Sequence, residues 1–326
     1  MSAISITRRG LAGLGAAALF GAPSAWSQSF PSRPIRLIVP YPPGGPTDLA
    51  ARLVAQGLAQ RLGQNIVVEN RAGGNGVVGT DAAAKAPADG FTITVGNNQT
   101  HVTNKALIAN LPYDPTRDFV PLAVMVTIPA VLVVHPAVPV QSVAELIALA
   151  KAQPGLLSYG STGNGSASHL TAELFRLRTG VAIEHVPYRG TAQLTTDLLS
   201  NRVQLSFATL PSVLQQVQAG SLRVLAATGR ARAPQLPEVK TLSELGIPVE
   251  AESWLALFTR AGTAPEITAR LSREIMAVLD DRQIQEGLAQ VGFAMLPLGE
   301  GEARGFLQAE TLKWNSVVAE AKVTLD

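Results

Sequence analysis

The chain of 326 residues contains no cysteine. This absence excludes a disulfide framework, a cysteine nucleophile, a zinc site built on thiolates and an anchor on a lipidated cysteine. Aromatic residues make up only 5% and charged residues only 15% of the sequence, whereas hydrophobic residues reach 47%. Such a balance favours helices packed on buried strands rich in alanine, valine and leucine.

An excess of charge is also missing. Lysine and arginine number 26 and acidic residues 24, and two of the basic residues, Arg8 and Arg9, lie in an N-terminal segment without any acid. The rest of the chain is therefore neutral, and no basic stripe interleaved with aromatic residues runs through it. We expect no binding to nucleic acid.

Long hydrophobic runs are absent too, because a transmembrane helix needs about 20 apolar residues and no stretch reaches that length. A basic pair, a short apolar run and small residues at Ala25 and Ser27 predict a signal peptide over residues 1–27. The segment also loosely fits a twin-arginine signal, so the export route stays open. We expect a periplasmic protein that carries no lipid anchor.

Strand and helix patterns alternate from Ile35 onward, which is typical of an α/β fold with mostly parallel sheets flanked by helices. Strands are predicted at 35–39, 66–69, 92–96, 157–160, 183–186, 203–208 and 222–227, and helices at 47–62, 72–85, 168–179, 191–200 and 212–218. A capping box over 142–145 predicts a further helix start, and a second box over 241–244 lies in a turn-rich segment. Thr263 is expected to cap a long C-terminal helical part.

An apolar run over 120–134, broken by Pro129, and a return strand over 254–259 indicate that the chain crosses twice between two lobes. The first lobe is predicted to comprise residues 28–128 and 252–326, and the second lobe residues 129–251. Two crossing strands form a hinge, and closure about a hinge is a common way to enclose a ligand. A mature chain of about 300 residues is long for one core and suits two.

A strand, a Pro/Gly turn and an amphipathic helix follow one another directly between residues 35 and 62. Pro43, Gly44 and Gly45 form the turn, and Thr47 is the expected N-cap of the helix. This geometry points free backbone N–H groups and a helix N-terminus at one spot, which suits a bound anion. A sharp connection that holds no ligand would produce the same pattern.

A second junction of this kind follows the strand 157–160. Gly160, Gly163 and Gly165 leave backbone N–H groups accessible, and serine and threonine hydroxyls surround them. The candidate ligand residues here are Ser161, Gly163, Asn164, Ser166 and His169. A flexible linker is the alternative, and His169 could be a plain helix-start residue. Two such loops in two α/β units predict that a small acidic molecule is held between two lobes.

Other candidates lie at the carboxyl ends of predicted strands, where open α/β sheets bind ligands. Asn97, Asn98 and Thr100 follow the third strand, and Tyr188 follows the strand 183–186. The first three could instead be plain loop residues. The histidines show no spacing with carboxylates that would indicate a metal site, so neither a metal nor another cofactor is expected.

Motifs of the common enzymes are incomplete. The Gly-x-Ser-x-Gly pattern of hydrolases fails around Ser161 and Ser166, and no phosphate-binding Gly-Lys-Ser/Thr is present. Residues 163–168 form only a degenerate dinucleotide fingerprint, because the last glycine is missing. We therefore expect a binding protein rather than an enzyme, with an exported hydrolase as the alternative.

A series of ordered motifs resembles one family across essentially the whole mature chain. They are Arg33-Pro-Ile-Arg-Leu-Ile-Val-Pro-Tyr-Pro-Pro-Gly-Gly, Val68-Glu-Asn-Arg-Ala-Gly-Gly, Lys85-Ala-Pro-Ala-Asp-Gly, Leu111-Pro-Tyr-Asp, Tyr159-Gly-Ser-Thr-Gly-Asn-Gly-Ser, His185-Val-Pro-Tyr-Arg-Gly and Leu210-Pro-Ser. These motifs are similar to those of the Bug-type extracytoplasmic solute receptors of tripartite tricarboxylate transporters. The resemblance implies a two-lobed periplasmic binding protein, type II-like, that closes on a small organic acid.

The resemblance also implies partners and site residues. Permease subunits in the membrane would receive the ligand, a sensor kinase is an alternative partner, and we expect the receptor to be a monomer. In the family, two loops pinch the ligand carboxylate. Carried over to this chain, those loops correspond to Pro43, Gly44, Gly45 and Thr47 on one side and to Ser161, Gly163, Asn164, Ser166 and His169 on the other.

The chain departs from the family pattern at three places. Pro46 stands where a third glycine is common, which removes one N–H group from the first loop. Ala208 and the following threonine replace an Asp-Asn pair that can meet an ammonium group, so Ala208 argues against an amino-acid ligand. Leu255 and Ala256 follow Trp254 where an aromatic residue and a glycine are usual, so the far wall of the predicted cleft is expected to differ.

Overall fold

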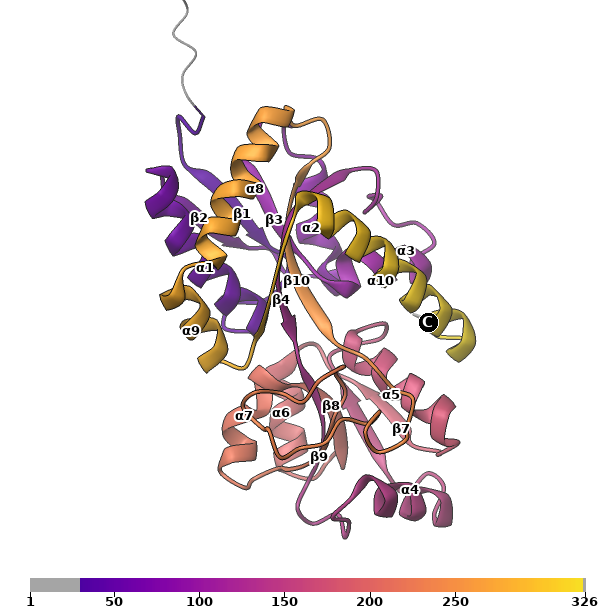
Figure 1. Cartoon of the computed structure of the whole chain (residues 1–326). Coiled ribbons are helices and arrows are strands. Elements are labelled where there is room, and N and C mark those ends of the chain that lie inside the picture. The colour runs from indigo at the N-terminus through magenta and orange to yellow at the C-terminus, as the bar shows by residue number, and fades with distance from the viewer. Residues whose placement is uncertain (1–29, 325–326) are drawn as a thin grey trace, which may run out of the picture.

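A computed structural model describes residues 30–324, so the predicted signal peptide lies outside the described residues. Two β-sheets with helices on their faces form an upper and a lower lobe, and long strands connect the two (Figure 1). The two-lobed α/β fold expected from the sequence is confirmed.

The first sheet takes its strands from both ends of the chain. They are β1 (Ile35–Val39), β2 (Ile66–Asn70), β3 (Thr92–Gly96), β4 (Phe119–Ile128), β10 (Ser253–Arg260) and β11 (Ala294–Gly299), in the order β11-β4-β10-β3-β1-β2. Its helices are α1 (Pro46–Leu62), α2 (Val77–Ala84), α3 (Asn104–Leu107), α8 (Pro265–Leu279), α9 (Arg282–Gln290) and α10 (Glu300–Ala321), with the short helical turns η1 (Gly74–Gly76) and η2 (Gln99–Thr103).

The second sheet is built from the middle of the chain. Its strands are β5 (Ala130–Val134), β6 (Ser158–Ser161), β7 (Glu184–Pro187), β8 (Leu205–Thr209) and β9 (Arg223–Ala227), in the order β7-β6-β8-β5-β9. Its helices are α4 (Val143–Ala152), α5 (Ala167–Thr179), α6 (Thr191–Leu199) and α7 (Leu210–Gln218).

Both sheets are mixed, which corrects the expectation of mostly parallel strands. β1 pairs in parallel with β2 and β3, and β6 pairs in parallel with β7 and β8. By contrast, β10 is antiparallel to β3 and β4, β11 is antiparallel to β4, and β5 is antiparallel to β8 and β9. β5 and β10 follow the two crossings, so each starts at the junction and runs away from it. Their neighbours β3, β4, β8 and β9 run toward the junction, and the pairs are therefore antiparallel.

Most predicted elements are found where the sequence places them. β1 and β3 match their predicted bounds, and the ends of the other five predicted strands shift by at most two residues. The capping box at Ser142 is confirmed, since its side chain accepts the N–H of Glu145. The box over 241–244 also closes, with Thr241 and Glu244 bonded in both directions, but it stabilises a turn and not a helix.

Three local predictions are wrong. The C-terminal part is not helical throughout, because β11 separates α9 from α10. This edge strand contains Pro297, which lacks an N–H and obscures the strand pattern. The segment expected to be a polar loop after β3 forms the helical turn η2. Finally, Ala264 and not Thr263 precedes α8, because Pro265 starts the helix.

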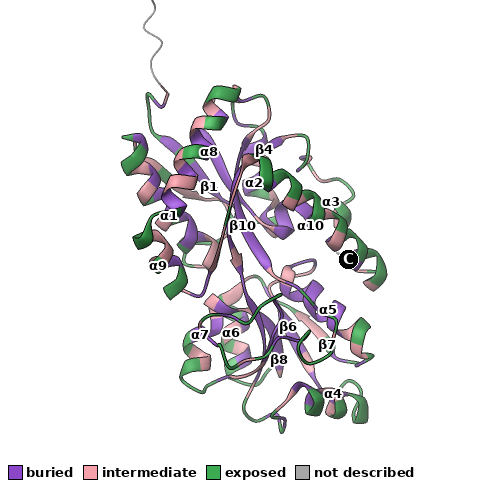
Figure 2. Cartoon of the chain, viewed as in Figure 1, coloured by how far each residue is buried: buried purple, intermediate pink, exposed green. Residues whose placement is uncertain are grey.

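The buried core consists mainly of the strands, while the helices expose one face to solvent (Figure 2). One apolar cluster joins the lobes, because it contains Trp314 of α10 together with Phe175 of α5. Arg178 of α5 and Glu320 of α10 also form an ion pair with an N–O distance of 2.6 Å. The C-terminal helix therefore extends from the first lobe onto the second (Figure 1).

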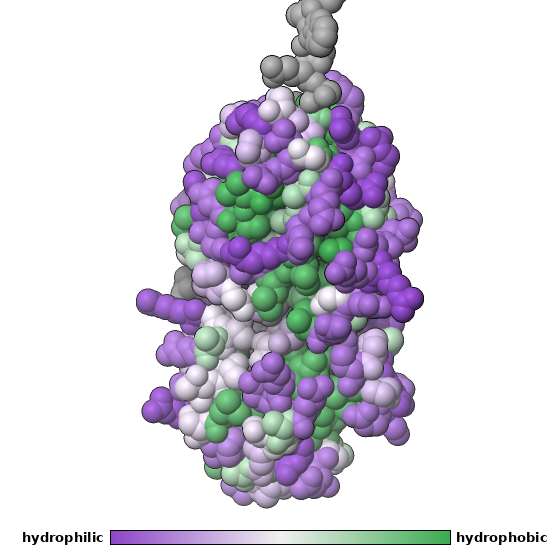
Figure 3. Space-filling model, turned by 90° about the vertical axis from the view of Figure 1, so that its left-hand side faces the viewer, coloured by the Kyte–Doolittle hydropathy of each residue, from purple (hydrophilic) through white to green (hydrophobic). Residues whose placement is uncertain are grey.

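Large apolar side chains are much more frequent in the core than on the surface. Those that are exposed, such as Leu49 and Val67, are scattered along the chain. On the flank seen in Figure 3, apolar side chains lie in small groups separated by hydrophilic ones. Within residues 30–324, no helix combines the length and the hydropathy needed to cross a bilayer.

Candidate functional site

The carboxyl ends of the parallel strands face the junction between the lobes. β4 runs from the first lobe toward the second and β10 returns antiparallel to it, so a strand antiparallel to β10 ends at the junction. β3 is antiparallel to β10, and β1 and β2 are parallel to β3, so the loops after these three strands lie at the junction. In the second lobe β5 runs away from the junction and β8 is antiparallel to it, so the loops after β8 and after its parallel partners β6 and β7 lie at the junction too. The topology therefore directs both glycine-rich loops toward the junction.

The first loop joins β1 to α1 and ends in an uncapped helix N-terminus. Gly45 is the N-cap, with φ −80° and ψ 169°, and Pro46 takes the first helical position. The prediction of Thr47 as the N-cap is wrong, because a proline has the fixed φ that suits the first turn and starts the helix earlier. Among the described residues, the N–H groups of Gly45, Thr47 and Asp48 find no acceptor.

The side chain of Asp48 folds back onto the first loop and accepts one of its backbone N–H groups. Its carboxylate accepts hydrogen bonds of 2.9 Å from the N–H of Gly44, from Nε of Arg52 and from Nδ2 of Asn70. Burial alone would raise the pKa of Asp48, but these hydrogen bonds outweigh burial and lower the pKa below its usual range. Arg52 balances the charge of Asp48, so the neighbouring free N–H groups keep their attraction for an anion.

The second loop is held in shape by its own side chains. Each of four side chains accepts one backbone N–H: Ser168 from Thr162 at 3.1 Å, Ser161 from Gly163 at 3.2 Å, His169 from Gly165 at 3.0 Å and Ser166 from His169 at 3.3 Å. These groups, which the sequence suggested as ligand donors, thus build the loop. Within the part of the chain that the structure describes, the N–H groups of Asn164, Ala167 and Ser168 have no acceptor.

Two hydrogen bonds connect the lobes at this place. The hydroxyl of Thr103 in η2 donates to the carbonyl of Gly165 at 3.1 Å, and Nδ2 of Asn75 in η1 donates to the carbonyl of Asn164 at 3.5 Å. Asn75 has φ 56°, a left-handed conformation that asparagine tolerates better than most residues. Sequence reasoning missed both side chains, and the only signal for Asn75 was its place in a glycine-rich run.

Tyr41 joins the first loop to the loop after β3. Its hydroxyl lies 3.0 Å from Oδ1 of Asn97 and 3.1 Å from Oε1 of Gln99. Oδ1 of Asn97 also accepts the N–H groups of Gln99 and Thr100. Because burial raises the pKa of Tyr41, its phenol stays neutral and fixes Asn97 at the junction.

Four of the predicted site residues have side chains packed within their own lobe. Asn98 bonds to Glu310 and Ser253, Thr100 bonds to Asn97 and His101, Tyr188 donates to Asp197, and Ala208 lies with Tyr188 in the apolar core of the second lobe. All four are buried. Pro43 and Gly44 are exposed at the tip of the first loop, and the N–H of Gly44 is taken by Asp48.

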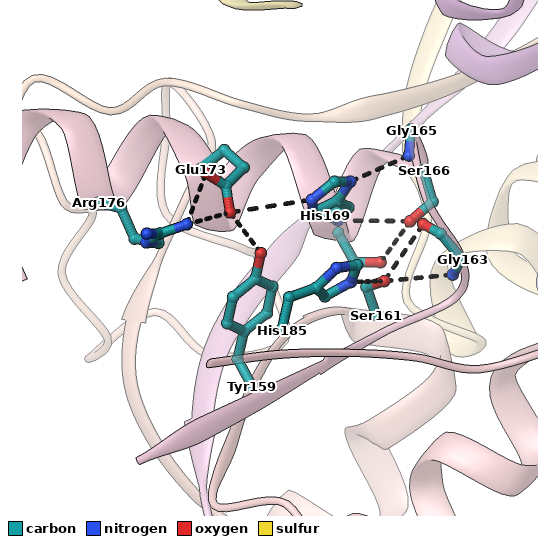
Figure 4. Close-up of polar contacts among 10 residues, drawn as sticks. Tyr159, Ser161, Gly163, Gly165, Ser166, His169, Glu173, Arg176 and His185 are labelled. Atoms are coloured by element: carbon teal, nitrogen blue, oxygen red, sulfur yellow. Dashed lines mark hydrogen bonds and ion pairs between the residues drawn. The ribbon is translucent and has the colours of Figure 1, made fainter. Parts of the chain in front are cut away.

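A stacked pair of histidines supports the second loop (Figure 4). The ring centroids of His169 and His185 lie 4.0 Å apart with an angle of 4° between the planes, and Tyr159 stacks on His185 at 4.8 Å. Burial lowers the pKa of both histidines, and that of His185 falls to about 4. Both rings are therefore neutral at physiological pH. Within residues 30–324, no group of three or more histidine, aspartate or glutamate side chains is arranged to hold a metal ion.

Comparison with known proteins decides the family. A family model described as tripartite tricarboxylate transporter family receptor matches residues 50–323. The chain belongs to this family. It is similar to protein BugT of Bordetella pertussis, with 38% identity over 92% of each chain, so the Bug-type resemblance is confirmed.

Solved structures agree with this assignment. The chain is similar to Rpa4515 of R. palustris, solved with adipate, with a TM-score of 0.86, 36% identity and coverage of 90% of this chain and 99% of the other. It is also similar to MatC (Rpa3494) of Rhodopseudomonas palustris, solved with bound malate, with a TM-score of 0.81, 28% identity and coverage of 89% and 100%. The family is one of solute-binding receptors.

Proposed function

We propose that the protein is an exported receptor that binds a small organic carboxylate between its lobes and delivers it to the permease of a tripartite tricarboxylate-type transporter. The observation that carries the proposal is the set of backbone N–H groups without acceptors in the two loops, notably those of Gly45, Thr47, Asn164 and Ala167. The acids in the Rpa4515 and MatC structures, adipate and malate, support a carboxylate as the ligand class.

The energetics suit reversible capture. A hydrogen bond to a charged group contributes about 1.5–3 kcal/mol. Three or four such bonds, less the entropy lost on association, give affinities in the micromolar range. A receptor of this kind needs no catalytic base, because the ligand leaves unchanged.

We propose that residues 28–128 and 252–326 move as one lobe and residues 129–251 as the other. The crossings then lie between β4 and β5 and at the start of β10. Closure would bring the two loops onto the carboxylate, and the permease would recognise the closed form. Residues 1–27 would direct the chain to the periplasm, where the receptor would act as a monomer.

A carboxylate screen tests the function. The mature protein is heated with adipate, malate, citrate and benzoate in separate wells, and any acid that raises the melting temperature is titrated by calorimetry. A ligand at 100 times its Kd stabilises by about 2.7 kcal/mol, which a thermal shift detects readily. Arg189→Ala is the control, since backbone N–H groups and not this exposed side chain are proposed to hold the acid. Loss of binding in that variant would point to an ion-pair site instead.

A further inference from the structure

His169 and His185 each help to fix the backbone N–H of one glycine in the second loop (Figure 4). Nδ1 of His169 on α5 accepts the N–H of Gly165 at 3.0 Å. Nε2 of His185 on β7 lies 2.7 Å from Oγ of Ser161, and that oxygen accepts the N–H of Gly163 at 3.2 Å. The first histidine therefore acts on the loop directly, and the second acts through a serine.

The bond from Gly165 decides which nitrogen of His169 carries the proton. A backbone N–H can only donate, so Nδ1 must be unprotonated, and the neutral ring carries its proton on Nε2. Nε2 lies 3.8 Å from Oε1 of Glu173, which is too long for a direct hydrogen bond. Protonation of Nδ1 would place two N–H donors against each other across 3.0 Å, so the bond to Gly165 would break.

The charge of Glu173 favours a cation on the pair, but burial outweighs it and lowers the pKa of both histidines. The carboxylate of Glu173 also accepts the hydroxyl of Tyr159 at 2.6 Å and Nη1 of Arg176 at 2.8 Å, so its charge is shared with these partners. Arg176 opposes a second cation nearby, and Glu184 acts on Arg176 rather than on the rings. Two imidazolium rings stacked at 4.0 Å would also repel each other.

We infer that His169 is a positioning residue of the proposed anion site, which it keeps in shape through a neutral Nδ1 bonded to Gly165. That bond orients the backbone between Asn164 and Ser168, whose free N–H groups are the proposed donors. When the ring is protonated, the loop loses this support and the receptor binds its acid more weakly. The inference rests on the proposed function, and it adds that affinity falls as the solution becomes acidic.

The first test needs no ligand. In the full mature protein with ¹⁵N-labelled histidine, long-range ¹H–¹⁵N spectra report the proton position on each ring. We expect His169 to be neutral with its proton on Nε2 at pH 7, and the amide signal of Gly165 to shift with the titration of that ring. A proton on Nδ1, or a charged His169 at pH 7, would overturn the inference.

The second test measures binding of adipate by calorimetry between pH 7.5 and pH 5. In His169→Asn, the amide oxygen can accept the N–H of Gly165 but does not titrate, so the affinity of this variant should lack the pH dependence that the ring contributes. Once the pH falls below the pKa of His169, the ratio of wild-type Kd to variant Kd should increase by up to about tenfold for each further pH unit of acidification. The titration of adipate itself cancels in this ratio.

Two further variants complete the design. His169→Leu removes the acceptor and should weaken adipate binding at every pH. His135→Asn is the matched control, because Nδ1 of His135 accepts the N–H of Ala137 at 3.1 Å at the far end of β5. It should keep the wild-type pH profile.

The outcomes separate the two proposals. If wild type and His169→Asn follow the same pH profile, the role of His169 is refuted while carboxylate binding stands. If the wild type does not bind adipate at pH 7.5, the proposed function fails for this acid, and the spectra of the ligand-free protein still decide whether His169 holds Gly165.

Discussion

Thr103 and Gly165 are 62 residues apart in the chain and belong to different lobes, yet the hydroxyl of Thr103 donates to the carbonyl of Gly165 at 3.1 Å. Gly165 also gives its N–H to His169, so both polar groups of its backbone are bonded. The N–H of Gly165 is thus bonded within its own lobe, and its carbonyl is bonded to the other lobe. Such a contact can form only when the lobes are close together.

Thr103→Val should therefore weaken ligand binding by reducing the stability of the closed form. Valine keeps the shape of the side chain but leaves the carbonyl of Gly165 without its donor. A hydrogen bond of this kind contributes about 0.5–1.5 kcal/mol, so Kd should rise by about threefold to tenfold in calorimetry. Thr268→Val is the control, because the hydroxyl of Thr268 in α8 donates to the carbonyl of Ala264, the N-cap of the same helix. Equal effects of both variants would show that the contact between lobes plays no part.

Gly45→Val should weaken ligand binding strongly while leaving the fold intact. A Cβ at Gly45 meets only the carbonyl of Pro42, at 3.9 Å, and φ of −80° accepts a side chain. The isopropyl group would cover the N–H groups at the start of α1, so we expect at least a tenfold loss of affinity in calorimetry. Gly299→Val makes a matched control, since Gly299 is also a helix N-cap, with φ −69°, and a Cβ there meets only Cγ of Met276, at 3.9 Å. If the two variants bind equally well, the first loop does not hold the ligand.

The positions of the strands along the chain could be predicted in part because apolar runs in this chain have clear ends. Ile35–Val39 and Thr92–Gly96 are bounded by turn residues, and both were assigned to the residue. Ala294–Gly299 gave no such pattern, because it lies at a sheet edge and contains a proline. The antiparallel pairs could not be foreseen either, since they depend on where the chain crosses between the lobes.

The two glycine-rich loops were easier to predict than the roles of their side chains. Glycine and proline mark the two loops because they set backbone angles locally. Whether Ser166 faces a ligand or caps α5 depends on the fold of the whole loop, and here it accepts the N–H of His169. Asn75, Thr103 and His185 were missed because each acts on a partner distant in sequence.

Glu310 of α10 should be important for stability far beyond an ordinary glutamate. Its Oε2 accepts Nε1 of Trp254 at 3.0 Å, Nε1 of Trp314 at 2.8 Å and Nδ2 of Asn98 at 3.1 Å. Glu310→Leu leaves both buried indole N–H groups without an acceptor, and each costs about 1–3 kcal/mol. Nδ2 of Asn98 keeps only the carbonyl of Glu252, at 3.3 Å. Urea unfolding should therefore show a loss of several kcal/mol. Glu286→Gln, at an exposed ion pair on α9, should change little. A small effect at Glu310 would mean that water replaces the carboxylate.

Buried neutral histidines should make the fold sensitive to mild acid. His101 is buried and stacks on Phe258 with 3.8 Å between ring centroids, and burial lowers its pKa to about 3. Because the folded pKa is below the unfolded value of about 6.5, the unfolded chain binds the proton first. The stabilisation is complete above about pH 6.5 and is lost progressively as the pH falls toward 3. At pH 5 this single group should cost about 2 kcal/mol.

The comparison of wild type with His101→Phe isolates this effect. Phenylalanine keeps the stacking on Phe258 but cannot take up a proton, so its loss of unfolding free energy between pH 7 and pH 5 should be about 2 kcal/mol smaller than that of the wild type. Urea unfolding at both pH values gives the two differences directly. Asp48 and Asp114, whose pKa values are lowered, do not disturb the comparison, because their contribution is lost only as the pH falls below about 4. If the variant and the wild type lose the same amount, His101 is accessible to protons in the folded protein and its burial carries no penalty for charge.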